Sequence, residues 1–276
     1  EATCQARGQA VNTEKTRRSQ FNRIRGALGH VNLADLTTRH CAELLEELRM
    51  AGKARSAQAI RSTLRELLRE AIAAGHIERN VADATKAPRV QVKRDRLTLE
   101  QFLEIHAAAL TLPDAWIARA LELALVSGQS REVIAAARFD DISAGTWWCH
   151  RGKTDARIAI PTDLTLAATG WSLDSVVRAC RDRVVSRHLI HHSRARTKSQ
   201  PGDPVWLDTI SRSFARARDL TACCSDHPPT FHEIRSLAER LYAAQGVDTQ
   251  ALLGHRDPRT TALYKDVRGS EWITVR

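Results

Sequence analysis

Residues 228–237 have the sequence P-P-T-F-H-E-I-R-S-L, which combines a helix start with two chemically active side chains. Thr230 and Glu233 have the spacing of a capping box, which predicts a helix with Thr230 as its N-cap. His232 would then occupy the second helical position, and Arg235 would lie one turn later on the same face. A helix N-terminus, an imidazole and a guanidinium together suit the binding of a phosphodiester. Taken alone, however, a His and an Arg at this spacing are more often ordinary surface residues.

The stretch that follows ends in one of only two tyrosines in the chain. Residues 252–255 are L-L-G-H, and Asp257-Pro258 is a strong N-cap and first-turn pair, so a short helix is predicted to end near Tyr264. Tyr242 falls on an apolar helix and is predicted to be a core residue. Tyr264 has charged neighbours and is poorly placed for burial, which makes it a candidate exposed nucleophile.

The positive charge of the chain is concentrated in its first third. The chain has 276 residues and a formal net charge of +10. Residues 1–96 hold 19 Lys+Arg and 11 Asp+Glu, whereas residues 97–276 hold 23 and 21. This balance favours nucleic acid as the partner. Residues 86–96 are basic, contain a proline and show little periodicity, which is typical either of a linker lying along a phosphate backbone or of a solvated connector.

Composition argues against several other classes of protein. The longest apolar runs, such as residues 123–126, are far shorter than the ~20 residues of a membrane helix, so no membrane partner is expected. The chain does not open with a secretory signal, and its six cysteines include no C-x-x-C pair, which favours a reducing cytoplasm. Cys223 and Cys224 lie near His227, but a fourth metal ligand at a sensible spacing is missing. We therefore expect no metal site and no cofactor.

Helical periodicity organises the first third of the chain. Apolar spacing predicts three helices, at about residues 12–28, 38–52 and 56–75. Thr38 is the predicted cap of the second helix, and Arg61, Arg65 and Arg69 line one side of the third. This basic face suits a groove of duplex DNA, although neighbouring glutamates also allow a salt-bridged solvent face. The candidate DNA-binding residues share a basic side chain on these helices or the linker: Arg17, Arg18, Arg61, Arg65, Lys93, Arg94 and Arg96.

The rest of the chain mixes helices with two short strands. Thr98 and Gln101 form a second capping-box pattern, and residues 127–130 interrupt a helical pattern. Alternating residues predict strands at 146–150 and 156–160, joined by a hairpin turn at 152–155. One further helix is predicted to carry Phe102, Ile105 and Ala109, and another to carry Val133, Ile134 and Ala137. The others are predicted at about residues 114–126, 172–185, 209–220, 231–245, 248–253 and 258–266. The predicted fold is therefore mostly α with a small antiparallel sheet.

Taken together, these motifs resemble one known family. H-E-I-R, then L-L-G-H, then a tyrosine nine residues later is similar to the C-terminal pattern of the tyrosine recombinases, the phage integrase family. R-G-K-T at 151–154 is similar to that family's strand-turn lysine, and residues 59–77 and 268–272 resemble the lambda-type integrases. The small amino-terminal domain that binds arm sites in those integrases is expected to be absent here. The resemblance covers essentially the whole chain and implies a two-domain tyrosine recombinase architecture: a helical core-DNA-binding domain (1–87), a basic linker (88–96) and an α+β catalytic domain (97–276).

The resemblance also implies a reaction, which is site-specific cleavage and rejoining of DNA through a 3′-phosphotyrosine bond. Tyr264 would be the nucleophile, with Arg235 and His232 binding the phosphate. His255 would position the phosphate and assist Tyr264, and Lys153 would protonate the leaving 5′-oxygen. The implied partners are double-stranded DNA, further copies of the chain in a homotetramer on recombining DNA, and DNA-bending accessory proteins. The implied setting is the bacterial nucleoid, for a bacterial or phage-encoded protein.

One position departs from the family pattern. The first catalytic arginine of the family lies in T-G-x-R-x-x-(E/D)-L, whereas residues 127–134 are S-G-Q-S-R-E-V-I. Ser130 stands at the arginine position and Val133 at the acidic one, while Arg131 and Glu132 are displaced by one residue, about 100° on a helix. Losing one such donor typically costs about 10²–10³ in rate. The chain is therefore expected either to be impaired or to use Arg131 as a substitute.

Three functional interpretations remain open from the sequence: a site-specific recombinase, a catalytically inactive DNA-binding relative, and a metal-dependent nuclease. The nuclease would need clustered carboxylates, and none is evident. For either DNA-binding interpretation we expect the two domains to clamp opposite faces of the duplex. The tail at 269–276 is expected to be strand-like and to pack either on its own catalytic domain or on that of a neighbouring protomer.

Overall fold

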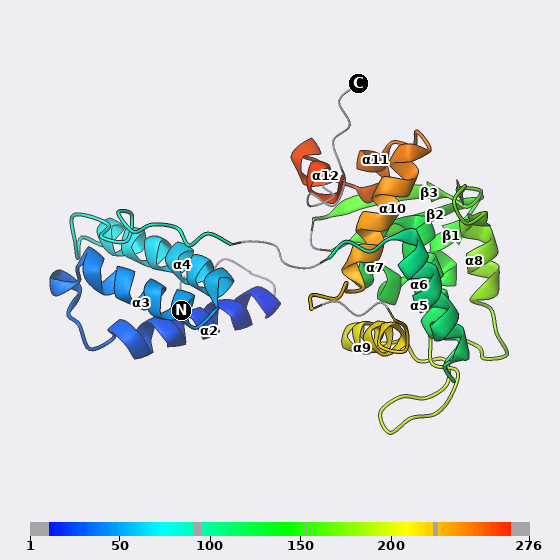
Figure 1. Ribbon diagram of the computed structural model, residues 1–276, viewed down its shortest axis with the longest axis horizontal. Coiled ribbons are helices and arrows are strands. Elements are labelled where there is room, and N and C mark those ends of the chain that lie inside the picture. The colour runs from blue at the N-terminus through cyan, green and yellow to red at the C-terminus, as the bar shows by residue number, and fades with distance from the viewer. Residues whose placement is uncertain (1–10, 91–94, 153, 223–225, 266–276) are drawn as a thin grey trace. The chain divides into compact units, whose positions relative to one another are not determined.

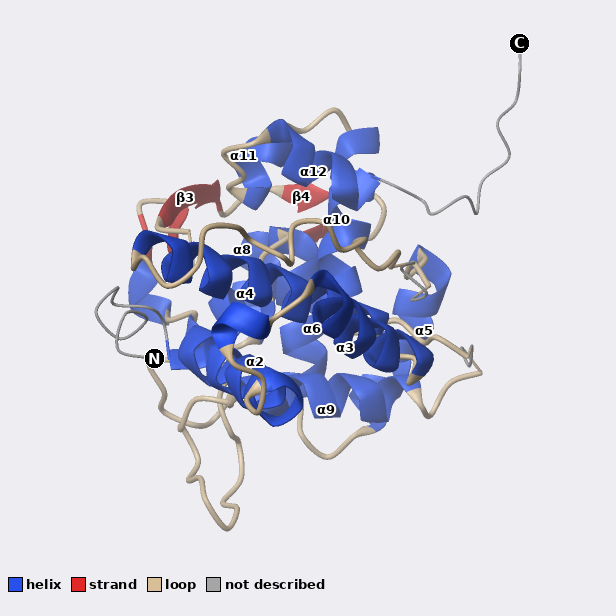
Figure 2. Cartoon of the chain, turned by 90° about the vertical axis from the view of Figure 1, so that its left-hand side faces the viewer, coloured by secondary structure: helices blue, strands red, loops and turns tan. Residues whose placement is uncertain are grey.

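In the computed structural model, the described residues are 11–90, 95–152, 154–222 and 226–265 (Figure 1). The chain divides into two compact units, Glu1–Val92 and Lys93–Arg276, which we call unit 1 and unit 2. Helices dominate (Figure 2), and all the described strands belong to the sequence of unit 2. No helix in the described ranges is long and apolar enough to cross a membrane. The predicted three-part division at residues 87 and 97 stays a prediction.

Helices with one apolar stripe each form unit 1. Its described elements are α2 (Val11–Leu28), the 3-10 helix η1 (Leu33–Asp35), α3 (Thr38–Met50) and α4 (Ala54–Ala73). The stripes of α3 and α4 face each other and supply most of a shared core: Cys41, Leu44, Leu45, Leu48, Ile60, Leu64 and Leu68. The three predicted helices of this region are confirmed.

The start of α3 differs from the predicted one by a residue. Its N-cap is Thr37, whose hydroxyl accepts from the His40 N–H at 3.4 Å while His40 Nδ1 accepts from the Thr37 N–H at 3.2 Å. Thr38, the predicted cap, donates its hydroxyl to the Val81 carbonyl at 2.9 Å. The chain that packs beside α3 therefore engages Thr38 and leaves its neighbour to cap the helix.

A buried central helix organises unit 2. Every residue of α6 (Trp116–Ser127) is buried except Arg119, which explains why this helix is apolar on nearly all sides. The helices that pack on it are α5 (Leu99–Thr111), α7 (Arg131–Ala136), α8 (Leu173–Ala179), α9 (Leu207–Arg218) and α10 (His232–Ala244) (Figure 1). The predicted capping box of Thr98 with Gln101 starts α5 and is confirmed.

A small antiparallel sheet completes the unit, with strand order β1-β2-β3. Its strands are β1 (Ile142–Ser143), preceded by η2 (Phe139–Asp141), then β2 (Thr146–Arg151) and β3 (Ala156–Pro161). Trp147 and Cys149 face the core opposite Ile160 and Ile158, while the residues between them are exposed. A second pair consists of β4 (Thr165–Leu166) and β5 (Trp171–Ser172). The predicted fold class, mostly α with small antiparallel sheets, is confirmed.

The helix predicted at 172–185 is shorter in the structure, because α8 ends at Ala179. The chain beyond it forms single bridges instead, between Arg138 and His188 and between His191 and Pro204. Residues 180–185 are therefore not helical.

Two short helices carry the C-terminal motifs of the described chain: α11 (Thr249–Leu253) and α12 (Pro258–Lys265). As predicted, Asp257 starts α12, since its carboxylate accepts from the Arg259 N–H at 2.9 Å. Tyr242 is fully buried on α10 and donates its hydroxyl to the Val126 carbonyl at 2.7 Å, which confirms it as a core residue.

Candidate active site

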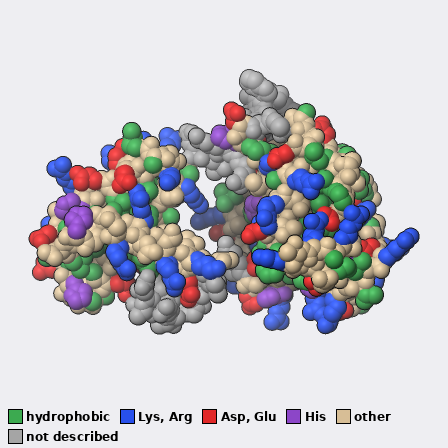
Figure 3. All heavy atoms as spheres, turned by 90° about the horizontal axis from the view of Figure 1, so that it is seen from below, with side chains coloured by type: hydrophobic (Ala, Val, Ile, Leu, Met, Phe, Trp, Pro, Cys, Tyr) green, Lys and Arg blue, Asp and Glu red, His purple; other side chains and the backbone are tan. Residues whose placement is uncertain are grey.

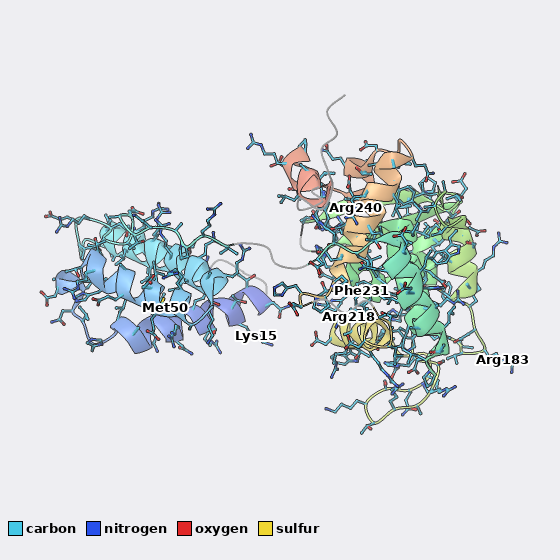
Figure 4. The ribbon with its side chains drawn as sticks, in the orientation of Figure 1. Lys15, Met50, Arg183, Arg218, Phe231 and Arg240 are labelled. Atoms are coloured by element: carbon cyan, nitrogen blue, oxygen red, sulfur yellow. The ribbon has the colours of Figure 1, made fainter. Side chains whose placement is uncertain are left out.

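The first turn of α10 begins one residue later than predicted. Its N-cap is Phe231, which has helical dihedrals (φ −48°, ψ −33°), and not Thr230. Phe231 is 4% exposed and packs edge-to-face on a phenylalanine of α9 (Figure 4). The carboxylate of Glu233, the predicted partner of the cap, lies 3.1 Å from Arg96 Nη1. Burial of the phenylalanine ring sets the helix start, so His232 is the first helical residue rather than the second.

Arg235 is the buried centre of the site, with 1% of its surface exposed. Its Nη1 donates to the Gly128 carbonyl and its Nη2 to the Leu253 carbonyl, each at 2.6 Å. Gly128 is the C-cap of α6 and Leu253 is the last residue of α11, so the guanidinium satisfies carbonyls at two helix ends. Burial, followed by the nearby charge of Arg151, lowers the pKa of Arg235 to about 10, so the side chain is still charged at neutral pH.

Gly254 fixes the position of the Leu253 carbonyl. Its φ of +60° closes α11 with a left-handed C-cap, a conformation that favours glycine. A Cβ at this position would lie 2.5 Å from Cδ1 of Ile158 on β3. The glycine of the L-L-G-H motif is therefore required both by the backbone and by the close approach of β3.

His255 connects Arg235 to the helix of the candidate nucleophile. Its Nε2 lies 3.1 Å from Arg235 Nη2, and its Nδ1 lies 2.9 Å from the Thr261 hydroxyl. Because a guanidinium can only donate, Nε2 is the acceptor and the ring proton is on Nδ1. Burial, followed by the charges of Arg235 and Arg151, lowers the pKa of His255 to about 4. The imidazole is therefore neutral at neutral pH.

Tyr264 completes the cluster from near the end of α12. Its hydroxyl lies 3.2 Å from Nε2 of His232. The centroid of its ring lies 5.3 Å from that of His255 and 5.6 Å from the guanidinium carbon of Arg235. Side chains predicted from two separate stretches of sequence thus converge on one place: His232, Arg235, His255 and Tyr264.

Arg96, a predicted DNA-binding residue, makes extensive contacts inside unit 2. Its Nη1 donates to the carboxylate of Glu233 at 3.1 Å and to the hydroxyl of Ser236 at 2.7 Å, and its Nη2 donates to the Leu263 carbonyl at 2.6 Å. Since Leu263 directly precedes Tyr264, Arg96 ties the nucleophile helix to the first turn of α10. Sequence patterns could not reveal this role, because the partners lie at least 137 residues away.

The position that departs from the family pattern lies at the start of α7. Ser130 is the N-cap of that helix and Arg131 is its first residue. The Arg131 guanidinium donates to the Ser211 hydroxyl and lies 4.0 Å from the Asp208 carboxylate, both on α9. These described polar partners of Arg131 both lie on α9. Its substitution for the missing arginine stays a prediction.

Two of the predicted DNA-binding arginines of α4 hold the segment that follows this helix. Arg61 donates to the Thr85 carbonyl at 2.7 Å, and Arg65 pairs with the Asp83 carboxylate. On the face of unit 1 seen in Figure 3, Lys and Arg side chains alternate with Asp and Glu side chains. These two arginines therefore have structural partners whether or not they also contact DNA.

Of the other predicted site residues, some are described in the structure and some are not. Arg17 pairs with Glu66 at 2.8 Å, which joins α2 to α4, while Arg18 is exposed. The remaining predicted site residues lie outside the described residues: Lys93, Arg94 and Lys153. The predicted tail at 269–276 and the cysteine pair at 223–224 also lie outside them. Within the described ranges, no group of three or more His, Cys, Asp or Glu residues is arranged to hold a metal ion.

Two comparisons with known sequences establish the family. Residues 95–271 match the phage integrase family, and residues 2–87 match the phage integrase central domain. The chain belongs to the phage integrase family. Its unit 2 therefore carries the tyrosine recombinase catalytic domain of that family, as predicted.

Relatives of this integrase-family chain match it over nearly its whole length. It is 39% identical over 269 residues to the prophage integrase IntE of Escherichia coli K12, an alignment that covers 96% of the chain and 72% of IntE. A structure of an integrase dimer of Escherichia phage lambda bound to a core site has a TM-score of 0.92 and 37% identity, covering 100% of this chain and 95% of that one. A lambda integrase tetramer bound to a Holliday junction also has a TM-score of 0.92 and 37% identity, covering 100% of this chain and 77% of that one.

Proposed function

We propose that this integrase-family chain cleaves and rejoins duplex DNA at specific sites by transesterification at Tyr264. The observation that carries the proposal is the convergence of Tyr264, His232 and Arg235, with the phenol oxygen 3.2 Å from His232 Nε2. The phenol oxygen attacks the scissile phosphorus and the bond to the 5′-oxygen breaks, which leaves a 3′-phosphotyrosine and a free 5′-hydroxyl. Because one phosphoester replaces another, the strand can be rejoined without a nucleotide.

Two protons move in the proposed step. The proton of the Tyr264 hydroxyl passes to His232 Nε2, which is within hydrogen-bond distance of it. The leaving 5′-oxygen takes a proton from Lys153, the lysine of the hairpin between β2 and β3. Rejoining reverses both transfers when a 5′-hydroxyl attacks the phosphotyrosine.

Arg235 retains donors for the phosphate. A guanidinium has five N–H groups, and three of those of Arg235 have acceptors: the Gly128 carbonyl, the Leu253 carbonyl and His255 Nε2. Its Nε is buried and has no partner in the described part of the chain. A buried charged donor without an acceptor is rare, because leaving it unpaired is costly. We assign this N–H to a non-bridging oxygen of the scissile phosphate.

Recombination joins two duplexes, so the proposed assembly contains several copies of the chain. Lambda integrase, which is 37% identical, has been crystallised as a tetramer bound to a Holliday junction. We extend this arrangement to the present chain, as a homotetramer on recombining DNA at the bacterial nucleoid. DNA-bending accessory proteins are the remaining partners in the proposal.

Trapping on nicked DNA tests this function. When a nick lies a few nucleotides to the 3′ side of the scissile phosphate in the same strand, cleavage releases a short 5′-hydroxyl strand, so the covalent intermediate accumulates. A pool of nicked duplexes with randomised sequence, selected by non-covalent binding to the Tyr264→Phe chain, supplies the substrate. We expect a denaturant-resistant adduct with the wild-type chain and none with Tyr264→Phe, while both bind the selected duplex.

One observation favours a second function. Ser130 brings no charge where the family has its first catalytic arginine, so the chain could bind sites without cutting them. In that case both the wild-type chain and Tyr264→Phe retard duplex DNA in a gel, and neither forms an adduct. This outcome contradicts the proposed recombinase.

A further inference from the structure

Arg151 enters the site from the sheet. It is the last residue of β2, whose side chains alternate between the core and solvent. Trp147 and Cys149 are buried and Trp148 and His150 are exposed, so the half-buried Arg151 lies on the same side of the strand as the core residues. Arg151 therefore carries a positive charge on the core side of the sheet.

Arg151 and Arg235 donate to one oxygen atom. Nη1 of Arg151 lies 2.9 Å from the Leu253 carbonyl, the same carbonyl that accepts from Arg235 Nη2 at 2.6 Å. The two guanidiniums are therefore adjacent, although their residues come from β2 and α10. Arg151 is also among the charges that lower the pKa of both Arg235 and His255, after burial in each case.

Such a pair of like charges is normally neutralised. Arg96, in the same unit, has a carboxylate partner in Glu233. By contrast, the carbonyl of Leu253 is the single hydrogen-bond acceptor of Arg151 in the described ranges, and no carboxylate there pairs with it. Two neighbouring guanidiniums with spare N–H groups repel each other until an anion binds between them.

A purely structural role of Arg151 does not explain why two guanidiniums lie side by side. Arg151 does help to satisfy the carbonyl at the end of α11, but Arg235 already donates to that carbonyl. A neutral donor would serve the same purpose without adding charge beside a buried cation. The geometry is better explained by an anionic ligand.

We propose that Arg151 is a catalytic residue that binds the scissile phosphate, and that it supplies the second guanidinium missing at Ser130. This inference rests on the proposed recombinase function. Ser130 starts α7 two residues after Gly128, whose carbonyl accepts from Arg235, while Arg131 is held by α9. A serine at this place removes the guanidinium that the family pattern supplies from α7, and Arg151 supplies one from β2.

The rate of covalent trapping tests the proposal. Arg151→Gln should form the adduct about 10²-fold more slowly than the wild-type chain while binding the same nicked duplex. Arg157→Gln is the matched control, because it removes the same charge from an exposed position on the facing strand β3. Arg151→Lys should recover part of the rate, since it keeps the charge but not the fork of donors. Equal rates for Arg151→Gln and Arg157→Gln overturn the proposal.

An uncharged methylphosphonate linkage distinguishes a catalytic role of Arg151 from a role in stabilising the end of α11. A methylphosphonate at the scissile position removes one negative charge, so it needs one guanidinium less. We expect the defect of Arg151→Gln, relative to Arg157→Gln, to shrink at least about tenfold on this DNA. A defect of the same size on both DNAs shows that Arg151 acts only through the fold, and overturns the proposal.

Inorganic phosphate distinguishes failure of this inference from failure of the proposed function. If the wild-type chain forms no adduct, the recombinase proposal fails, but the anion site can still be measured by calorimetry at constant ionic strength. Wild type and Arg157→Gln should then bind phosphate, and Arg151→Gln should bind it about tenfold more weakly. Equal affinities of Arg151→Gln and Arg157→Gln for phosphate overturn the inference.

Discussion

Two guanidiniums and a neutral imidazole meet at the end of α11. Arg151 and Arg235 donate to the Leu253 carbonyl, and His255 accepts from Arg235. Burial, followed by the neighbouring positive charges, lowers the pKa values of both His255 and Arg235, so another positive charge is unfavourable at this place. A phosphate that enters the site relieves the repulsion, so the charges are already in position before the reaction begins.

The lowered pKa of His255 makes stability depend on pH. Unfolded, its pKa is about 6.5, whereas in the folded chain the pKa is about 4. Between these values the unfolded chain binds more protons, so this residue lowers the free energy of unfolding as pH falls from about 6.5 to about 4. We expect His255→Gln to flatten the profile of urea unfolding over that window. A mutant profile as steep as that of the wild-type chain contradicts the assignment.

Restoring the family arginine should depend on Arg151. We expect Ser130→Arg to raise the rate of adduct formation about 10²-fold when Arg151 is glutamine, since it returns the missing charge. In the wild-type chain the gain should be smaller, because Arg151 already supplies that charge. The four single-turnover rates form a double-mutant cycle. Equal gains in both backgrounds would mean that the two positions act independently.

At the scale of elements, the junction of α11 and β3 depends on Gly254. Gly254→Ala combines a strained φ of +60° with a Cβ that would lie 2.5 Å from Ile158 Cδ1. Gly246 is a matched control, because it also has a positive φ, of +82°, but open space around its Cα. Chemical denaturation should show a loss of about 1 kcal/mol for Gly246→Ala and about 2–4 kcal/mol for Gly254→Ala. Similar losses would mean that β3 does not approach α11 closely.

The packing of α12 against α10 depends on the hydrogen bonds of Arg96. Arg96→Gln removes a guanidinium that bonds both Glu233 and the Leu263 carbonyl, so α12 should open more often. We expect faster hydrogen exchange in α12 and an adduct rate lowered about tenfold, with little change in core amides. Arg96→Lys keeps the charge as a control. Unchanged exchange in α12 for Arg96→Gln would show that other contacts hold the helix.

Elements were predictable from sequence wherever a periodic pattern was long. The helices of unit 1 and the β2–β3 hairpin followed from spacing that local physics determines. The convergence of the two C-terminal motifs was implied by the family resemblance. Helix starts were wrong by one residue where tertiary contacts decided them, as at Phe231, whose ring enters the core. The contact of Arg151 with the site could not be predicted from the sequence, because its acceptor lies 102 residues away in the chain.

At the scale of the whole molecule, charge should set DNA affinity. Residues 1–96 hold 19 Lys+Arg and 11 Asp+Glu, so most of the excess charge of the chain lies there. We expect the whole chain to lose affinity steeply with salt, as counterions are released, and a 97–276 fragment to bind more weakly with a shallower salt slope. Fluorescence anisotropy over a salt series measures both. Equal affinities and slopes would mean that the first third contributes little.

Transesterification at Tyr264 is the central claim, and peptide mapping of the trapped complex tests it most directly. The wild-type chain is incubated with the selected nicked duplex and digested with a protease and a nuclease, and the peptides are analysed by mass spectrometry. The account predicts a nucleotide joined through its 3′-phosphate to the peptide that contains Tyr264, and no such peptide from Tyr264→Phe. A nucleotide on any other residue, or a bound duplex with no covalent adduct, would contradict it.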